Sequence, residues 1–260
     1  MSDRLRGEIE AFLKNIGVSK VCVADATRGF EKAIRGCHPR DILRDCKSVI
    51  AFYCHIGMYY YHYLLYEGLT RRIGYIHRDW AGYKLVEFLR RRGYQATYPE
   101  GYIDEKRRIP IFSYKLAAYE AGLGVYGRSS IIVTPELGTK VLIGAILTDA
   151  AIEPDGKLTD FHPCENCQAC IKTCPINAIS LDAEPPRGYD REACITFTDW
   201  LKEKMGDNQF LCGCCYKSCP VGARKRTSFK ILVHKTLVGL EAIQRRRLVD
   251  EYKLGLGSEG

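Results

Sequence analysis

Eight of the thirteen cysteines in this chain have the type and spacing of ligands for iron–sulfur clusters. A first run has the pattern Cys-x2-Cys-x2-Cys-x3-Cys-Pro, a second has the pattern Cys-x2-Cys-x3-Cys-Pro, and one more cysteine lies between the runs. These residues are Cys164, Cys167, Cys170, Cys174, Cys194, Cys212, Cys215 and Cys219. Because a four-iron cluster takes about four thiolates, they predict two clusters and a chain that carries electrons.

The order of the cysteines also predicts which of them share a cluster. In bacterial ferredoxin runs of this type, the first three thiolates bind one cluster and the fourth, directly before proline, binds the other. The first cluster is therefore expected to be held by Cys164, Cys167, Cys170 and Cys219. The second is expected to be held by Cys174, Cys194, Cys212 and Cys215. Cys214 lies between two ligands and is assigned to neither cluster.

Two other uses of cysteine compete with this interpretation. Structural zinc also takes four thiolates, but its usual signature is two separated Cys-x2-Cys pairs, not a fourfold run that ends in Cys-Pro. Disulfides require an oxidising compartment, and the segment MSDRLRGEIE lacks the apolar core of a signal peptide. We therefore expect a cytoplasmic iron–sulfur protein, with zinc as the alternative. The buried apolar role usual for free cysteine is expected for Cys22, Cys37, Cys46 and Cys54.

Length and composition leave a large part of the chain to explain. The chain has 260 residues, and its cysteine-rich part begins only at Cys164. Apolar residues make up 46% of the chain and charged residues 27%, which is usual for a globular protein. The longest apolar stretches, such as VLIGAIL at 141–147, are too short to cross a bilayer, so no membrane association is expected. Basic runs contribute to the net charge of +8. They either bind an acidic partner protein or nucleic acid, or simply form solvent-exposed surfaces.

The spacing of apolar residues predicts an α/β domain in front of the cysteines. Helices are expected at 2–17, 39–46, 79–92 and 111–121. Buried strands are expected at 18–24, 48–54, 94–98, 129–134 and 140–148. Six tyrosines between Tyr53 and Tyr66 either line a pocket for a flat ligand or pack in the core. The predicted domains are an α/β domain at 1–157, a ferredoxin-like two-cluster domain at 158–225 and a C-terminal helical extension at 226–260.

A glycine-rich turn, AGLGVYGRSS at 121–130, has the spacing of a dinucleotide-binding fingerprint. That fingerprint requires a strand before it and a helix after it, whereas here a helix is expected before and a strand after. A nicotinamide site is therefore not expected. Two interpretations stay open: tight packing of the turn against the sheet or a cluster, or the edge of a cofactor site near Arg128, Ser129 and Ser130, which donate hydrogen bonds.

The sequence resembles the epoxyqueuosine reductase and reductive dehalogenase superfamily. The resemblance covers about residues 110–220 and is carried by the two cysteine runs and by AGLGVYGRSS, TPELG at 134–138 and GAILTD at 144–149. It implies a divergent member, with an α/β domain that binds a corrinoid (cobalamin) and a domain with two 4Fe-4S clusters that supplies electrons. The implied corrinoid-binding residues are Gly122, Gly124, Tyr126, Gly127, Arg128, Ser129, Ser130, Thr148 and Asp149.

The resemblance breaks down at the proton donor. Epoxyqueuosine reductases use an aspartate three residues before a proline, and alignment on Pro110 places Arg107 at that position. Reductive dehalogenases use a tyrosine beside a basic residue, and this chain has several tyrosines in the region. The candidate catalytic residues are therefore Tyr102, Asp104 and Tyr126.

Three functions fit these features. The first is a corrinoid-dependent reductase that takes electrons from a low-potential donor of the ferredoxin or flavodoxin type and reduces a small-molecule or nucleoside-like substrate. The second is a two-cluster electron-transfer protein without its own corrinoid, which reduces a partner protein. The third is an epoxyqueuosine reductase acting on tRNA, which Arg107 makes doubtful.

Overall fold

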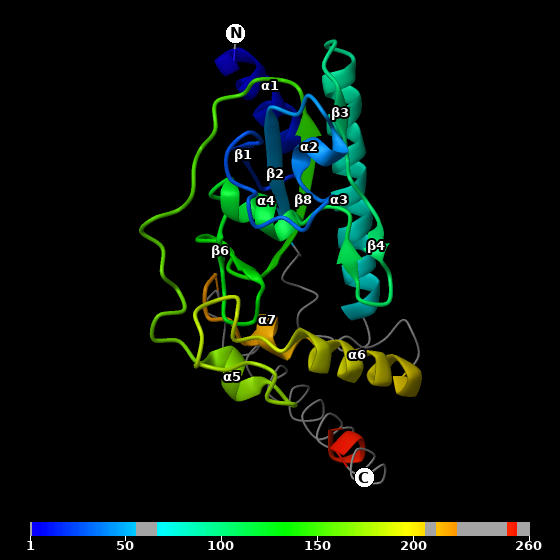
Figure 1. Cartoon of the computed structure of the whole chain (residues 1–260), viewed down its shortest axis with the longest axis vertical. Coiled ribbons are helices and arrows are strands. Elements are labelled where there is room, and N and C mark those ends of the chain that lie inside the picture. Colours follow the sequence, from blue (N-terminus) through cyan, green and yellow to red (C-terminus); the bar gives the residue numbers. More distant parts are fainter. Residues whose placement is uncertain (1, 56–66, 206–211, 223–248, 254–260) are drawn as a thin grey trace, which may run out of the picture.

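An antiparallel sheet of four strands, in the order β1-β2-β8-β3, forms the centre of the N-terminal domain (Figure 1). The computed structural model describes residues 2–55, 67–205, 212–222 and 249–253. The central strands β2 (Ser48–His55) and β8 (Val141–Thr148) pair along their whole length, with Ser48 opposite Thr148 and His55 opposite Val141. The edges are β1 (Lys20–Asp25) and β3 (Ala96–Thr97). The predicted α/β fold is confirmed.

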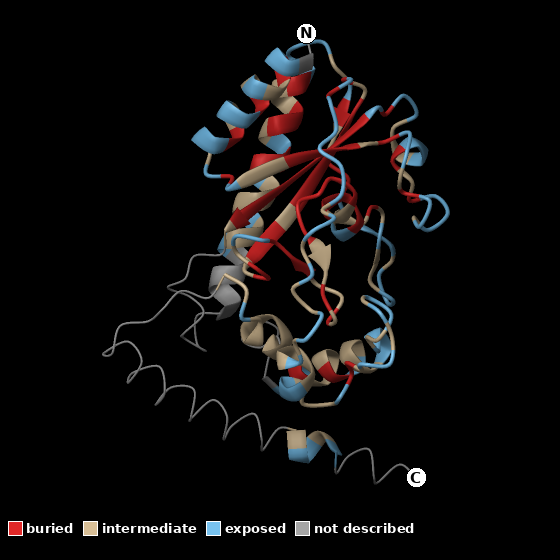
Figure 2. Ribbon diagram, turned by 90° about the vertical axis from the view of Figure 1, so that its left-hand side faces the viewer, coloured by how far each residue is buried: buried red, intermediate tan, exposed pale blue. Residues whose placement is uncertain are grey.

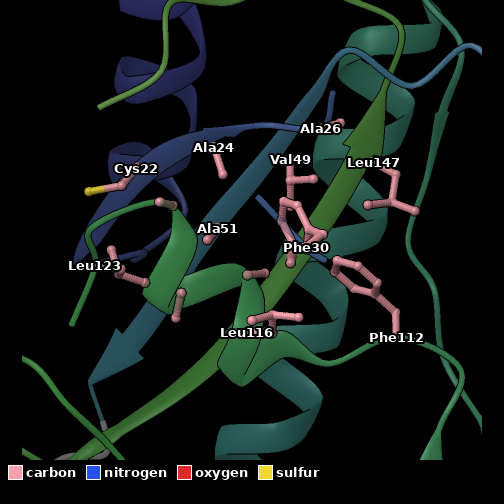
Figure 3. Packing of buried hydrophobic residues seen from close by; sticks show 14 of the residues in the cluster. Cys22, Ala24, Ala26, Phe30, Val49, Ala51, Phe112, Leu116, Leu123 and Leu147 are labelled. Atoms are coloured by element: carbon pink, nitrogen blue, oxygen red, sulfur yellow. The ribbon is translucent and has the colours of Figure 1, made fainter. Parts of the chain in front are cut away.

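Helices cover both faces of this sheet. On one face, α1 (Ser2–Asn15) and α3 (Glu67–Arg90) pack against alternate residues of β2, including Ile50 and Phe52. On the other face, α4 (Tyr114–Glu120) packs against Val49 and Ala51 of the same strand (Figure 3). Because successive strand residues point to opposite faces, β2 is buried on both sides, and Figure 2 shows the buried residues concentrated in this layer.

Several elements differ from the sequence prediction. The helix expected at 79–92 is the second half of α3, which begins at Glu67. The strand expected at 129–134 is reduced to β7 (Ile132–Val133), which pairs with β6 (Val125–Tyr126) outside the main sheet. An unpredicted hairpin consists of β4 (Tyr102–Asp104) and β5 (Ile109–Pro110), and α2 (Pro39–Ile42) is a single turn. These pieces are too short to have a recognisable periodicity.

Predictions about individual residues are confirmed in two places. Cys22, Cys37, Cys46 and Cys54 are all buried. A helix precedes the glycine-rich turn and a short strand lies within it, as the argument against a dinucleotide fingerprint requires. Of the six tyrosines, Tyr53 is buried in β2 and the others lie outside the described residues. Most of the C-terminal extension also lies outside them.

The cysteine-rich part contains three helices below the sheet in Figure 1: α5 (Ala169–Thr173), α6 (Arg191–Met205) and α7 (Cys214–Ser218). It is joined to the α/β domain through the residues that follow the TPELG turn. Thr139 Oγ1 donates to the Tyr216 carbonyl over 2.7 Å, and Lys140 Nζ donates to the carbonyls of Cys219 and Val221. The start of β8 is therefore fixed to the second cysteine run.

The segment 153–157, which precedes the cysteine-rich part, is anchored to the α/β domain. The Asp155 carboxylate accepts hydrogen bonds from the Val23 backbone over 2.8 Å and from Arg6 over 2.6 Å. Behind it, Gly122 has a φ of +72°, and a Cβ built there would lie 2.0 Å from the Gly156 carbonyl oxygen. The glycine-rich turn therefore packs directly against the connection between the domains.

We expect Gly122→Ala to lower the free energy of unfolding by about 3 kcal/mol, because the new methyl group meets backbone in a left-handed conformation. Gly93→Ala is the matched control: its φ is +85°, but nothing lies within 4 Å of the added Cβ. Gly93→Ala should lower the free energy of unfolding by only about 1 kcal/mol. Urea unfolding of both variants measures the difference, and equal losses would contradict the packing described here.

No helix in the described part of the chain is long and apolar enough to cross a membrane.

Candidate functional site

Cysteines from both runs line one small cavity at the base of the glycine-rich turn. From the first run come Cys164, Cys167 and Cys170, and from the second come Cys215 and Cys219. Gly127, Arg128 and Ser129 form part of the wall. The four cysteines predicted to share the first cluster thus face a common space, although Cys219 is far from the others in sequence.

Two more predicted ligands, Cys174 and Cys194, interact with Cys215 of the cavity wall. Cys194 is in the first turn of α6, and Cys215 is in α7. The Tyr189 side chain hydrogen-bonds to Cys194 and also lies near Cys215. The Cys174 Sγ atom accepts a hydrogen bond from the Ala178 backbone over 3.2 Å. Hydrogen bonds to sulfur are one of the means by which proteins adjust the potential of a cluster.

Burial raises the pKa of the Cys215 thiol to about 12, with further contributions from Cys194, Cys170 and Cys174. Three of the four thiols assigned to the second cluster are therefore close together, and Cys170 of the first lies near them. Among the described residues, no three His, Cys, Asp or Glu side chains form a site for a single metal ion.

The glycine-rich turn lies between the cysteine cavity and a second, larger pocket. A Cβ on Gly127 would lie 3.6 Å from the Cys164 Sγ atom, and Arg128 Nε donates to the Cys164 carbonyl over 3.2 Å. Tyr126 and Arg128 line the larger pocket. Ser130 has a φ of +56°, and its carbonyl accepts a hydrogen bond from Lys115. This end of the turn therefore contacts both spaces.

The remaining predicted cofactor residues lie elsewhere. Gly122 packs against the domain connection, and Gly124 packs against β7, where a Cβ would lie 2.6 Å from the Ile132 side chain. Thr148 and Asp149 are at the far end of β8 from the cysteines, about 24 Å along the strand. There Thr148 Oγ1 donates to the Gln95 carbonyl, and Asp149 accepts from the Gln95 backbone. The structure does not bring these two residues to the pocket.

The larger pocket has a volume of about 1100 Å³ and is lined by residues of both the α/β part of the chain and the cysteine-rich part. Its wall includes the aromatic side chains of Tyr102, Phe112, Tyr119, Tyr126 and Phe161. Cys164 lines this pocket as well as the cysteine cavity. A pocket of this size is at the upper end of the range for small-molecule and cofactor sites, and one of the predicted cluster ligands forms part of its wall.

The three candidate catalytic residues differ in their relation to the pocket. Tyr102 and Tyr126 line it. Asp104 instead accepts a hydrogen bond from the Arg107 backbone within the hairpin turn. Tyr102 is 54% exposed, whereas burial, with additional contributions from Glu120 and Tyr119, raises the pKa of Tyr126 to about 12. Tyr126 is therefore the candidate tyrosine whose side chain is the more enclosed in the pocket.

Comparisons with known proteins find relatives of two named kinds. No protein-family model matches the chain. The chain is 26% identical over 255 residues to the epoxyqueuosine reductase of Bacillus anthracis, a match that covers 84% of this chain and 64% of that one. It is 34% identical over 133 residues to a tetrachloroethene reductive dehalogenase of Desulfitobacterium hafniense, with coverage of 50% and 22%. Relatives and structural neighbours of both kinds support a place for the chain in the superfamily of epoxyqueuosine reductases and reductive dehalogenases.

Solved structures of both branches of the superfamily share its fold. A catabolic reductive dehalogenase superposes with a TM-score of 0.65 at 19% identity, covering 95% of this chain and 36% of that one. An epoxyqueuosine reductase from Bacillus subtilis superposes with a TM-score of 0.60 at 19% identity, covering 88% and 68%. The chain spans between 22% and 64% of the length of the curated superfamily members described above.

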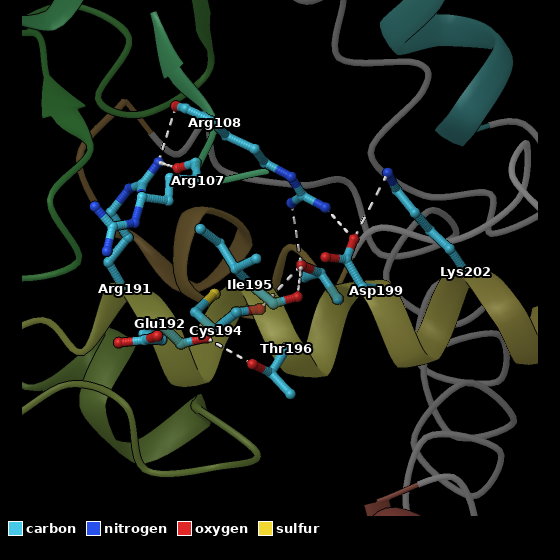
Figure 4. A network of polar contacts seen from close by, with 10 residues as sticks. Arg107, Arg108, Arg191, Glu192, Cys194, Ile195, Thr196, Asp199 and Lys202 are labelled. Atoms are coloured by element: carbon cyan, nitrogen blue, oxygen red, sulfur yellow. Dashed lines mark hydrogen bonds and ion pairs between the residues drawn. The ribbon is translucent and has the colours of Figure 1, made fainter. Parts of the chain in front are cut away.

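A network of arginines fastens the β4–β5 hairpin to α6 (Figure 4). The Arg191 guanidinium donates to the carbonyls of Arg107 and Arg108, the latter over 2.9 Å. The Arg108 side chain in turn pairs with Asp199 and reaches Thr198 Oγ1 over 3.4 Å. Arg108 has a φ of +51°, an uncommon conformation for a residue with a side chain. These contacts hold the pocket wall against the helix that carries Cys194.

Several pocket residues were not predicted from the sequence. Phe112, Lys115, Tyr119, Arg108 and Arg191 all line the pocket, but none belongs to a recognisable motif. Four of them come from residues 108–119, in the β4–β5 hairpin, α4 and the link between them, whereas Arg191 comes from the start of α6, far away in sequence. An excess of basic and aromatic residues in the segment 102–128 was the one available signal.

Proposed function

We propose that this chain is an iron–sulfur oxidoreductase in which the eight cysteines hold two four-iron clusters that supply electrons to the pocket between the domains. The observation that carries the proposal is the position of Cys164, which lines both the cysteine cavity and the pocket. A cluster held by this residue would be next to any ligand in the pocket. The electron donor would be a low-potential protein of the ferredoxin or flavodoxin type in the cytoplasm.

The residues around the cysteine cavity fit an iron–sulfur cluster. Sulfur donors without accompanying imidazole or carboxylate suit iron–sulfur chemistry, and the predicted ligands for the first cluster converge there from both runs. A backbone N–H hydrogen bond already reaches the Cys174 sulfur. A cluster of this kind supplies one electron at a time.

We further propose that the pocket binds a corrinoid together with a small substrate. A related structure is described as suggesting a mechanism for B12-dependent dehalogenation. In this chain, the aromatic faces of Tyr119 and Tyr126 and the guanidinium of Arg128 would hold such a cofactor. When bound, a corrinoid supplies a cobalt centre that accepts electrons and passes them to a substrate. The residues around it would exclude water and orient the substrate.

Tyr126 is our proposed proton donor. A substrate that gains electrons in this pocket needs a proton, and an acid within hydrogen-bond reach supplies it. Its pKa of about 12 keeps the Tyr126 hydroxyl protonated at neutral pH, and Tyr126 is joined directly to Gly127 beside Cys164. Tyr102 is more exposed and Asp104 is turned into the hairpin, so both are weaker candidates.

The pocket favours an enzyme over a simple carrier, because a protein that only relays electrons has no need of a cavity of about 1100 Å³. A tRNA substrate is the other alternative, since an epoxyqueuosine reductase has been solved with a modified tRNA stem loop. Arg107 stands where those enzymes have an aspartate, and its carbonyl is held by Arg191. We therefore propose a small-molecule substrate.

Titration with cobalamin under anaerobic, reducing conditions tests the corrinoid proposal. We expect about one cobalamin per chain to be retained through gel filtration and its visible spectrum to change on binding. Protein with intact clusters that retains no cobalt would contradict the proposed corrinoid enzyme. The electron-transfer protein without its own corrinoid would then be the remaining alternative.

A further inference from the structure

The pocket between the domains carries an excess of positive charge. Two carboxylates, Glu165 and Glu184, line it. Five cationic side chains do so as well: Lys32, Arg108, Lys115, Arg128 and Arg191. Arg108 is paired with Asp199, which leaves four cations facing two carboxylates. A cleft with one predominant sign of charge concentrates ligands of the opposite sign.

Two of these cations are bound mainly by neutral groups. Lys115 Nζ donates to the Ser130 carbonyl over 2.9 Å, and Arg191 donates to the carbonyls of Arg107 and Arg108. A carbonyl oxygen accepts a hydrogen bond but does not cancel a unit charge. These bonds therefore fix the two cations in position while their positive charge still acts on the pocket.

Lys115 and Arg191 also act on each other. Lys115 is an exposed residue, yet desolvation of its ammonium group in the pocket and, secondly, the charge of Arg191 lower the pKa of Lys115. The two cations therefore repel each other across the same space. An anion placed near both would relieve this repulsion and accept charge-assisted hydrogen bonds, which are stronger than neutral ones.

We propose that Lys115 and Arg191 form a subsite for an anionic group, a carboxylate or a phosphate, on the ligand of this pocket. The inference rests on the function proposed above, because it concerns the same pocket. Two sources of the anion have the same chemistry: an acidic group on the substrate, or the phosphodiester of cobalamin. In either case the subsite fixes one end of the ligand, while the aromatic wall packs against the rest.

Four probes distinguish the two sources. 4-Hydroxybenzoate and its neutral amide, 4-hydroxybenzamide, differ in a single negative charge. Cobalamin and cobinamide differ in the nucleotide loop with its phosphodiester. Inorganic phosphate is the fifth probe, as a minimal anion. Each is titrated by calorimetry into protein with its clusters in place, using wild type and Lys115→Gln.

We expect Lys115→Gln to weaken binding of the acidic member of one pair by about ten- to a hundredfold and to leave the neutral member unchanged. A loss of affinity for 4-hydroxybenzoate identifies a substrate subsite, and a loss of affinity for cobalamin identifies a cofactor subsite. Lys115→Arg, which restores the charge, should recover most of the affinity. Lys106→Gln is the control, since Lys106 is an exposed lysine of the hairpin turn.

The inference is overturned if wild-type protein shows no preference for the charged member of either pair and binds no phosphate, or if Lys115→Gln and Lys106→Gln behave alike. The proposed function fails separately. Wild type that binds neither corrinoid but still distinguishes hydroxybenzoate from its amide would keep the anion subsite and contradict the corrinoid. Urea unfolding of each variant confirms that it is folded.

Discussion

Cys219→Ser is expected to remove the same cluster as Cys164→Ser, although the two cysteines are 55 residues apart in sequence. Both line the small cavity. In the crossed pairing, the cysteine before proline in each run binds the cluster of the other run, so both residues are assigned to the first cluster. Each variant should keep about four of about eight iron atoms and should show the same low-temperature electron paramagnetic resonance spectrum. Reductase activity should be lost in both, because electrons could no longer reach the pocket beside Cys164.

Cys194→Ser and Cys214→Ser are the controls for this experiment. Cys194→Ser should also lose about half of the iron, but the signal that remains should be that of the other cluster. Cys214 is next to two predicted ligands and assigned to neither cluster, so Cys214→Ser should keep nearly all of its iron. A Cys219→Ser spectrum that matches that of Cys194→Ser instead of Cys164→Ser would overturn the crossed pairing.

Tyr126→Phe is expected to lower kcat by about 100- to 10,000-fold, the usual contribution of a positioned acid. The substitution removes only the hydroxyl group, so the ring should still pack beside Tyr119, whose ring centroid lies 5.5 Å away. KM, iron content and cobalamin retention should therefore stay close to those of wild type. Single-turnover measurements with the identified substrate would separate a slow chemical step from slow binding.

Tyr102→Phe is the matched control, since Tyr102 also lines the pocket but is 54% exposed at its edge. Its kcat should change by less than about threefold. If Tyr102→Phe is severely impaired and Tyr126→Phe is not, the acid has been assigned to the wrong tyrosine. Because the pKa of Tyr126 is raised to about 12, deprotonation of this group should not reduce wild-type activity below that pH.

The cysteine motif and the main strands could be predicted from sequence because their signals are local. The spacing of the first run is contained within eleven residues, 164–174, and β2 and β8 are continuous apolar segments. The glycine-rich turn was identified for the same reason. The structure shows tight packing at one end of this turn, where Gly122 lies against Gly156; at the other end Arg128 lines the pocket, and a cofactor site there stays a prediction.

The pocket could not be predicted, because it is assembled from segments that meet only in three dimensions. Lys115 on α4 and Arg191 at the start of α6 both line it, and nothing in the sequence between them indicates that they converge. Thr148 and Asp149 are implied as cofactor residues only by the resemblance of the GAILTD segment to the superfamily. Strand β8 begins beside the cysteines, and Thr148 and Asp149 lie at its opposite end.

Analysis of iron and acid-labile sulfide in protein purified without oxygen tests the central claim most directly. Two four-iron clusters predict about eight iron and about eight sulfide per chain, with broad visible absorption that bleaches on reduction. Folded protein that contains about two zinc ions and no sulfide would contradict the account, because the cysteines would then hold structural metal and the pocket beside Cys164 would have no source of electrons.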